Sequence, residues 1–207
     1  MKEEMASYEE VKMQEIKKAA EKEKKEIREK KGVIGLLKLV KEKKIFDDVK
    51  AMYPQIHLLL MSTAGEILDT NVSDNTLSLT AMYFAKTTLQ LAETKIGEGD
   101  DALSLGKKLI DMLPKEGLVH VMVFSDGLKV DGAQLVTGMT SALPETVALT
   151  GGLVGDGADF KHTYVGLDKL PEEGNIVAVG FYGEALLVSY GSMGGWDTFG
   201  PERIITK

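Results

Sequence analysis

The pattern of apolar and polar positions separates a polar N-terminal stretch from the rest of the chain. Residues 3–31 contain neither glycine nor proline, and they are rich in alanine, glutamate, lysine and glutamine, so they predict one long helix. Its apolar positions form only a thin stripe, and pairs such as Glu21 and Lys25 support the helix from its surface. We therefore assign residues 1–31 to a charged N-terminal helix and residues 32–207 to one domain.

The first two thirds of that domain mix short apolar runs with helical spacing. Antiparallel pairing as a hairpin is predicted for two alternating runs, residues 77–85 and 88–96, because almost nothing separates them. Asp101 is a predicted N-cap for the helix that follows. Further strands are predicted from apolar runs over residues 32–40, 56–61, 119–124 and 146–149. Helices are predicted from apolar spacing over residues 45–53, 102–113 and 131–143.

The last third carries strand signals only. Residues 163–165, 175–182 and 186–190 alternate with glycine-rich turns, which predicts an antiparallel meander. An order of mixed elements followed by strands alone indicates an α/β fold with a mixed, largely antiparallel sheet or sheets flanked by helices. An αββα sandwich is one arrangement that this order allows.

Composition and charge exclude several classes of protein. The chain has no cysteine, which excludes disulfides, thiolate catalysis and cysteine-based metal centres. No apolar run approaches the roughly 20 residues of a membrane helix, and the charged N-terminus does not resemble a signal peptide, so we expect a cytoplasmic protein without a membrane partner. Residues 45–207 carry a net charge of −11, which disfavours nucleic acid as a partner.

Two polar stretches that follow apolar runs are the main candidates for a site. Residues 150–160 place four glycines within seven positions, followed by acids, which indicates either a binding loop or a connection that needs glycine for geometry alone. The other stretch, residues 62–66, offers hydroxyls, an open glycine backbone and a carboxylate. Its alternative interpretation is a turn whose hydroxyls bond the nearby backbone.

Other chemistry is less well supported by spacing. Residues 150–160 match neither the dinucleotide fingerprint nor the Walker phosphate loop, and no two histidines have metal-ligand spacing. His162 is the one histidine considered for a ligand or haem contact. A hydrolase that uses Ser62 or Ser125, or the carboxylates of Glu66 and Asp156, stays open as an alternative, since its groups would assemble only in space.

The order of these stretches resembles the N-terminal FIST sensory domain. The resemblance spans about residues 32–207 and rests on four blocks of sequence: Leu-Met-Ser-Thr-Ala-Gly-Glu-Ile at 60–67, Phe-Ser-Asp-Gly at 124–127, Thr-Gly-Gly-Leu-Val-Gly-Asp-Gly at 150–157, and Gly-Trp with Gly-Pro at 195–201. The blocks at 62–66 and 151–157 are the most specific ones.

The resemblance implies a non-enzymatic, ligand-sensing domain of signal transduction. Such domains are coupled to signalling proteins such as histidine kinases, and they are thought to bind small polar, amino-acid-like metabolites. Some members bind haem, but we expect no cofactor, no catalytic residue and no metal here. We expect the two specific blocks to meet in space and to bind the ligand through Ser62, Thr63, Gly65, Glu66, Gly151, Gly152, Asp156, Gly157 and Trp196.

Two departures from the family pattern qualify these expectations. Met61 stands where the family often has cysteine, so a thiol role at that position is absent. The sequence also stops at Lys207, where the family usually continues into a C-terminal FIST half, so a pocket between two halves would be incomplete. Two interpretations stay open: a stand-alone variant, or a domain that needs a partner chain. A further alternative is an assembly module that forms a homo-oligomer through the N-terminal helix and binds no ligand.

Overall fold

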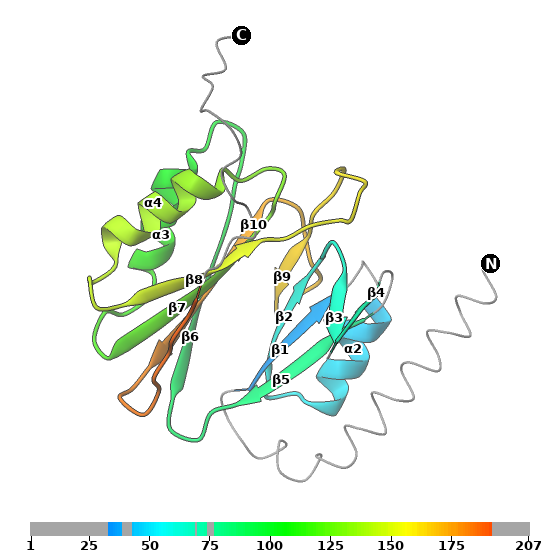
Figure 1. Cartoon of the computed structure of the whole chain (residues 1–207), viewed down its shortest axis with the longest axis horizontal. Helices are drawn as coiled ribbons and strands as arrows, with labels where there is room; N and C mark the ends of the chain where they lie inside the picture. Colours follow the sequence, from blue (N-terminus) through cyan, green and yellow to red (C-terminus); the bar gives the residue numbers. More distant parts are fainter. Residues whose placement is uncertain (1–32, 39–42, 69, 74–76, 192–207) are drawn as a thin grey trace, which may run out of the picture.

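Two four-stranded sheets form the body of the protein. A computed structural model describes residues 33–38, 43–68, 70–73 and 77–191. The predicted charged helix over residues 3–31 and Trp196 lie outside the described residues, so both stay predictions. The described part is a mixed α/β fold (Figure 1), in agreement with the fold class predicted from the sequence.

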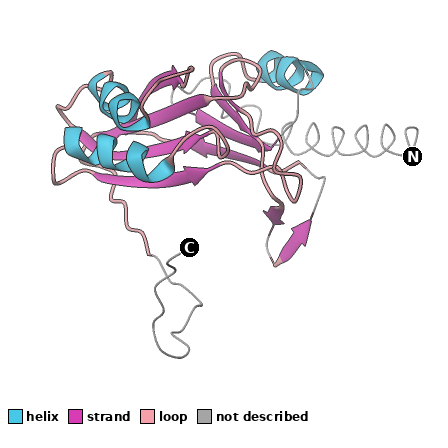
Figure 2. Cartoon of the chain, turned by 90° about the horizontal axis from the view of Figure 1, so that it is seen from above, coloured by secondary structure: helices cyan, strands magenta, loops and turns pink. Residues whose placement is uncertain are grey.

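Each sheet contains one parallel pair of strands and two antiparallel pairs. The first sheet has the order β5-β1-β2-β9, with bounds Leu79–Tyr83, Val33–Lys38, His57–Met61 and Val165–Leu167. The second sheet has the order β6-β10-β7-β8, with bounds Thr88–Lys95, Asn175–Tyr182, Leu118–Ser125 and Ala148–Leu153. A separate two-stranded ribbon, β3 (Glu66–Leu68) with β4 (Asn71–Ser73), stands apart from both sheets (Figure 2).

Helices cover the outer faces of the two sheets, which gives the αββα sandwich (Figure 1). Helix α2 (Lys43–Met52) places Val49 against Leu58 and Leu60 of β2. Helices α3 (Ala102–Asp111) and α4 (Gly132–Ala142) cover the second sheet. The third apolar layer lies between the sheets and joins Leu59, Val165, Val177, Val179 and Phe181.

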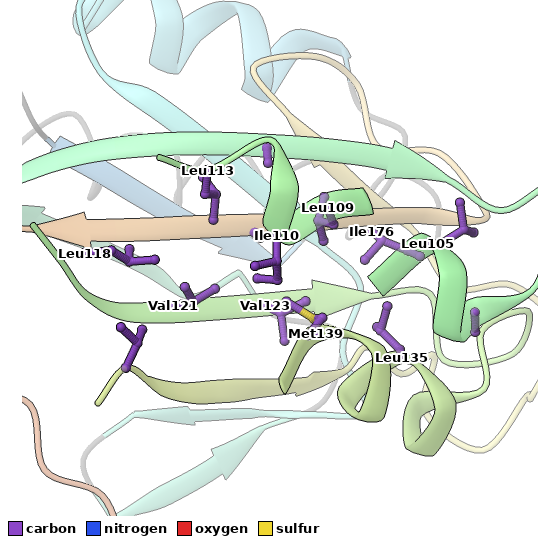
Figure 3. Packing of buried hydrophobic residues seen from close by; sticks show 14 of the residues in the cluster. Leu105, Leu109, Ile110, Leu113, Leu118, Val121, Val123, Leu135, Met139 and Ile176 are labelled. Carbon is purple, nitrogen blue, oxygen red and sulfur yellow. The ribbon is translucent and has the colours of Figure 1, made fainter. Parts of the chain in front are cut away.

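The layer under α3 and α4 is the largest apolar cluster. Figure 3 shows Leu109 and Ile110 of α3 and Met139 of α4 pointing onto the sheet, where they meet Val121 and Val123 of β7. The inward positions of both helices follow the apolar spacing that predicted them. This layer therefore follows directly from the sequence pattern.

The beginnings of both helices are fixed by aspartate caps. The carboxylate of Asp101, the predicted N-cap, accepts hydrogen bonds from the backbone N–H groups of Leu103 and Ser104. Asp131 accepts one from the N–H of Gln134 at the start of α4. Each bond satisfies a backbone donor that the first helical turn leaves unpaired.

The predicted hairpin of residues 77–85 and 88–96 is wrong, although both of its strands exist. Strand β5 pairs with β1 in the first sheet, whereas β6 pairs with β10 in the second. Phe84, in the short connection, packs in the layer between the sheets, with its ring centroid 5.6 Å from that of Phe181. Packing of this partly buried ring between the sheets favours a connection that crosses the sandwich over one that turns back on itself.

The predicted C-terminal meander is also wrong. Strand β9 pairs with β2 in the first sheet, while β10 lies between β6 and β7 in the second. All eight residues of β10 are buried, because one face meets the helices and the other meets the opposite sheet. No strand is assigned to residues 186–190. A short apolar run does not reveal its pairing partner.

The glycine stretch of residues 150–160 is only partly a loop. Strand β8 continues to Leu153, so Gly151 and Gly152 lie within a strand that pairs in parallel with β7. The prediction ended that strand at residue 149, because glycine normally marks a turn. The loop proper begins after Val154, whose N–H donates to the backbone oxygen of Ser125.

Candidate functional site

The two specific sequence blocks meet at a cavity between the sheets, which we call the inter-sheet cleft. Its volume is about 460 Å³. The end of β2 and the turn after it contribute one side, and β7, β8 and the residues after β8 contribute the other. The lining residues are Met61, Ser62, Thr63, Ala64, Met122, Phe124, Thr150, Gly151, Gly152, Leu153, Val154 and Gly155.

The two blocks approach each other closely, but along a different route from the predicted one. A Cβ atom added to Gly155 would lie 3.2 Å from the Cβ of Ala64. The sequence led us to expect neighbouring strands of one sheet, whereas β2 and β8 belong to opposite sheets. The blocks are brought together because the two sheets pack face to face.

The turn at residues 62–66 is held by its own hydroxyl groups. The N–H of Ser62 donates to the backbone oxygen of Tyr164 over 2.9 Å, and the N–H of Tyr164 donates to Ser62 Oγ over 3.0 Å. Thr63 Oγ1 donates to Glu66 Oε1 over 2.6 Å. Glu66 is only 5% exposed and is absent from the cleft lining, as is Gly65. This turn therefore presents Ser62 and Thr63 to the cleft and uses Glu66 as support.

The two glycines of β8 have different structural roles. Gly151 has φ +141°, and a Cβ atom there would lie 1.8 Å from the backbone oxygen of Val123. A Cβ added to Gly152 would meet no atom within 4 Å. Because side chains alternate along a strand, position 152 faces the same side as Thr150. Gly151 is therefore required by close approach to β7, whereas Gly152 leaves space in the cleft.

Asp156 organises the loop that follows the cleft. Its carboxylate accepts hydrogen bonds from the backbone N–H groups of Phe160, Lys161 and His162, over 3.1, 2.6 and 3.0 Å. The bonds from His162 and Lys161 lower the pKa of this exposed carboxyl group below its usual value. Gly157, with φ +76°, lies within the same loop. Neither residue lines the cleft.

Among the described residues, no serine is hydrogen-bonded to a histidine ring. Ser125 is 1% exposed, and the neighbouring Asp126 accepts bonds from Thr163 Oγ1 and from the N–H of Gly174, both over 2.6 Å. Within the described residues, the histidine rings bond elsewhere: His57 to Asp168, His120 to Thr150 and His162 to Glu173. The hydrolase alternative therefore gains no support from this geometry.

Several cleft residues were not named as ligand-binding residues from the sequence, among them Met122, Phe124 and Thr150, and neither was His120 behind them. Met122 and Phe124 of β7 and Thr150 of β8 line the cleft, and His120 Nε2 lies 2.9 Å from Thr150 Oγ1. Alternation along β7 places Met122 and Phe124 on one face, so that signal was present in the sequence. What the sequence did not reveal is that this face of β7 meets the turn at residues 62–66 across the cleft.

A second hollow of about 810 Å³ flanks β8 on the side of α4. It includes Leu135 and Val136 of α4 and Leu149 of β8, with Tyr190 at its border. It contains none of residues 61–64, so it does not join the two specific blocks. Among the described residues, no group of three metal-ligating side chains occurs, and no helix has the length and hydropathy to cross a membrane.

Comparison with known families and proteins gives one positive finding. The family model of the FIST N domain matches residues 38–207. This range contains both specific sequence blocks and every residue that lines the cleft. Comparison with curated proteins finds no match.

Proposed function

The chain belongs to the FIST N domain family, and we propose on this premise that it is a sensor whose ligand binds in the inter-sheet cleft. FIST domains are sensory domains of signal transduction, which supports a sensing role over catalysis. In this proposal the ligand is a small polar metabolite of the amino-acid-like kind that the family resemblance implies. The domain binds it without transforming it.

The observation that carries the proposal is the meeting of the two specific blocks across the cleft. Residues 62–64 and 150–155 lie far apart in the sequence and on opposite sheets, yet they line one cavity. Its volume, about 460 Å³, lies within the range of small-molecule sites. Ser62, Thr63, Gly151 and Gly152 thus line the proposed site directly. Gly65, Glu66, Asp156 and Gly157 support the segments that form it.

The remaining parts of the proposal concern the cellular setting. We place the protein in the cytoplasm, where it transmits ligand binding to a signalling protein such as a histidine kinase. Neither a cofactor nor nucleic acid is part of this proposal. Haem belongs in the ligand screen because the resemblance includes haem-binding members and because His162 is exposed.

A thermal-shift screen of the full chain tests the proposal. The panel contains amino acids, organic acids, nucleotides and haem. A ligand that binds only the folded state at a hundredfold excess over its Kd adds about 2.7 kcal/mol to the free energy of unfolding. We expect one chemical class to raise the unfolding temperature. No rise with any member of the panel would count against a sensor.

Gly152→Val tests whether the ligand binds in the inter-sheet cleft. Position 152 has open space around it, so valine is compatible with the strand and fills part of the cleft. We expect this variant to fold and to lose the ligand-induced shift. A full ligand-induced shift in Gly152→Val would place the site elsewhere.

One exposed surface favours assembly as a second function. Ile67 of β3 and Val72 of β4 are paired across the ribbon and are 72% and 73% exposed. An isolated two-stranded ribbon is marginally stable in water, so an apolar pair on it favours contact with another protein surface. If the protein forms a homo-oligomer through this ribbon, Ile67→Lys will lower its mass in sedimentation and leave the ligand-induced shift intact.

A further inference from the structure

Two hydroxyl groups on opposite sides of the inter-sheet cleft have their oxygen atoms already engaged. Ser62 Oγ accepts the N–H of Tyr164 over 3.0 Å. Thr150 Oγ1 lies 2.9 Å from His120 Nε2. A hydroxyl whose oxygen accepts from the protein still has one proton to donate. The direction of the bond between Thr150 and His120 therefore decides what the cleft offers to a ligand.

The burial of His120 indicates that its Nε2 atom is the donor in this bond and that Thr150 Oγ1 is the acceptor. His120 is 2% exposed, and its Nδ1 atom has no hydrogen-bond partner. If Nδ1 carried the proton, a buried N–H would be left without an acceptor, which is rarer in proteins than a buried lone pair without a donor. Burial also lowers the pKa of His120, so the doubly protonated ring is disfavoured. The proton accordingly lies on Nε2 and is donated to Thr150 Oγ1.

The third hydroxyl in the cleft is not available to a ligand. Thr63 Oγ1 donates its only proton to Glu66 Oε1 over 2.6 Å. Ser62 and Thr150 are thus the two hydroxyl donors of the cleft, one from each sheet. Both face a ligand as donors, so they select a group that accepts hydrogen bonds.

The rest of the described lining has no charge and is largely apolar. Met61, Met122 and Phe124 supply the larger side chains, and none of the described lining residues is acidic or basic. A charged ligand group that lies against this lining would lose part of its water without gaining an ion partner from these residues, which disfavours it relative to a neutral group.

We propose that the cleft recognises a neutral small molecule with an apolar body and a carbonyl-type acceptor, bound by the hydroxyl protons of Ser62 and Thr150. This inference rests on the proposed sensor function, and it replaces the polar, amino-acid-like ligand implied by the family resemblance with a neutral one. It disfavours a free amino acid, whose ammonium and carboxylate groups both need ion partners. It also assigns His120 as a positioning residue that fixes the orientation of the Thr150 hydroxyl.

Three probes with one carbon skeleton test the ligand class. Isocaproamide is neutral, isocaproate carries one charge, and leucine adds an ammonium group to isocaproate. Titration of the full chain, followed by NMR, gives a Kd for each. We expect isocaproamide to bind at least about tenfold more tightly than either charged probe, which corresponds to about 1.4 kcal/mol.

Hydroxyl deletions test the two donors. Thr150→Val and Ser62→Ala should each weaken isocaproamide binding about threefold to tenfold, as expected for one lost hydrogen bond. Thr150→Ser retains the hydroxyl and should restore binding, which separates the donor role from a general loss of packing. Thr137→Val, on the exposed face of α4, is the matched control and should bind as the unchanged protein does.

The tautomer of His120 is measured without any ligand. The chain has only three histidines, so a nitrogen-detected spectrum of the imidazole rings is assigned with His57→Asn and His162→Asn. We expect one proton-bearing nitrogen at Nε2 of His120 and a bare Nδ1. A proton on Nδ1 would overturn the donor assignment of Thr150, while the sensor function would be unaffected.

The outcomes separate this inference from the function on which it rests. Tighter binding of leucine or isocaproate overturns the neutral ligand class and leaves a sensor in place. Binding of isocaproamide that is unchanged in both Thr150→Val and Ser62→Ala overturns the two-donor arrangement. If none of the three probes binds, the ligand class is wrong, and the sensor function fails with it only when the wider thermal-shift panel is silent too.

Discussion

The two faces of the sheet β6-β10-β7-β8 are packed in different ways. On the face covered by α3 and α4, the side chains of Leu109, Ile110 and Met139 have no exposed surface. On the opposite face, Met122 and Phe124 are only partly buried and border the cleft. Both faces are built from the same strand, because Val121 and Val123 of β7 point to the helices while Met122 and Phe124 point to the other sheet.

This difference separates the part of the molecule that stabilises the fold from the part that is suited to binding. Under the centres of α3 and α4 the layer is fully packed, so any change in side-chain volume there is costly, and the hollow on this face lies beside β8. The layer between the sheets keeps a cavity and a buried histidine with an unpaired nitrogen atom, and both reduce stability. Retaining such features is expected of a site and not of a purely structural core.

Truncation of the Leu109 side chain in α3 gives the largest expected effect on stability. Leu109→Ala should lower the free energy of unfolding by about 3 kcal/mol, because it removes a fully buried side chain and leaves a cavity. Met122→Ala, in the layer between the sheets, should cost about 1 kcal/mol because that side chain is already partly exposed. Urea unfolding measures both, and equal losses would remove the distinction between the two layers.

Glycine-to-alanine substitutions compare the same two layers with a smaller change. A Cβ at Gly138 of α4 would lie 2.0 Å from the backbone oxygen of Leu103 in α3, whereas a Cβ at Gly152 meets nothing within 4 Å. The helix propensity of alanine favours Gly138→Ala by up to about 1 kcal/mol, but the clash with backbone outweighs it. We expect a net loss of about 2 kcal/mol.

Gly152→Ala is the control for this comparison. It should leave the free energy of unfolding within about 0.5 kcal/mol of its original value, the range of substitutions that touch nothing. Thermal unfolding of the two variants side by side gives the answer. A stabilised Gly138→Ala would mean that α3 and α4 separate readily, contrary to their close packing.

The sequence predicted local structure far better than it predicted which strands pair. Apolar spacing located α3 and α4, and Asp101 marked a helix start as expected. Pairing failed for residues 77–96, because a strand reveals its alternation but not its partner. The crossing depends on burial of Phe84 against Phe181, a contact between residues far apart in the sequence.

The candidate site was predicted only in part, because its local segments could be recognised in the sequence but the contacts between them could not. Residues 62–63 and 151–152 were chosen from hydroxyls and glycines after apolar runs, and all four line the cleft. Glu66 and Asp156 were chosen for their carboxylates, but each is engaged by its own segment. Thr150 lies in the stretch considered as a binding loop but was not named as a ligand-binding residue, and its contact with His120 appears only when β8 pairs with β7.

Asp168 extends the comparison to the layer in which α2 covers the other sheet with a smaller apolar cluster. Its carboxylate binds Lys50 of α2, His57 and the N–H of Leu58. Burial opposes its ionisation, but the hydrogen bonds from His57 and Lys50 outweigh burial and lower its pKa to about 2. Here charged hydrogen bonds supplement the smaller cluster.

Asp168→Asn should lower the free energy of unfolding by about 1–2 kcal/mol at neutral pH. Asparagine tolerates the positive φ of 54° at this position, so the change isolates the charge. Because the folded pKa is the lower one, this stability is complete above about pH 4 and is lost as the pH falls towards 2. Urea unfolding at pH 7 and pH 3 tests it, and equal differences between the two proteins at both values would contradict the assignment.

The smallest expected effect belongs to His120, the buried histidine of the cleft layer. Burial lowers its pKa in the folded protein, whereas the unfolded chain titrates near the ordinary value of about 6.5. The unfolded state therefore binds more protons between these two pKa values, so the contribution of His120 to stability is complete above about pH 6.5 and declines as the pH falls. His120→Gln should flatten the curve of unfolding free energy against pH between 7 and 5 and leave the Asp168 window below pH 4 unchanged. Parallel curves for the two proteins would mean that the ring is protonated at no extra cost in the folded protein, contrary to its burial.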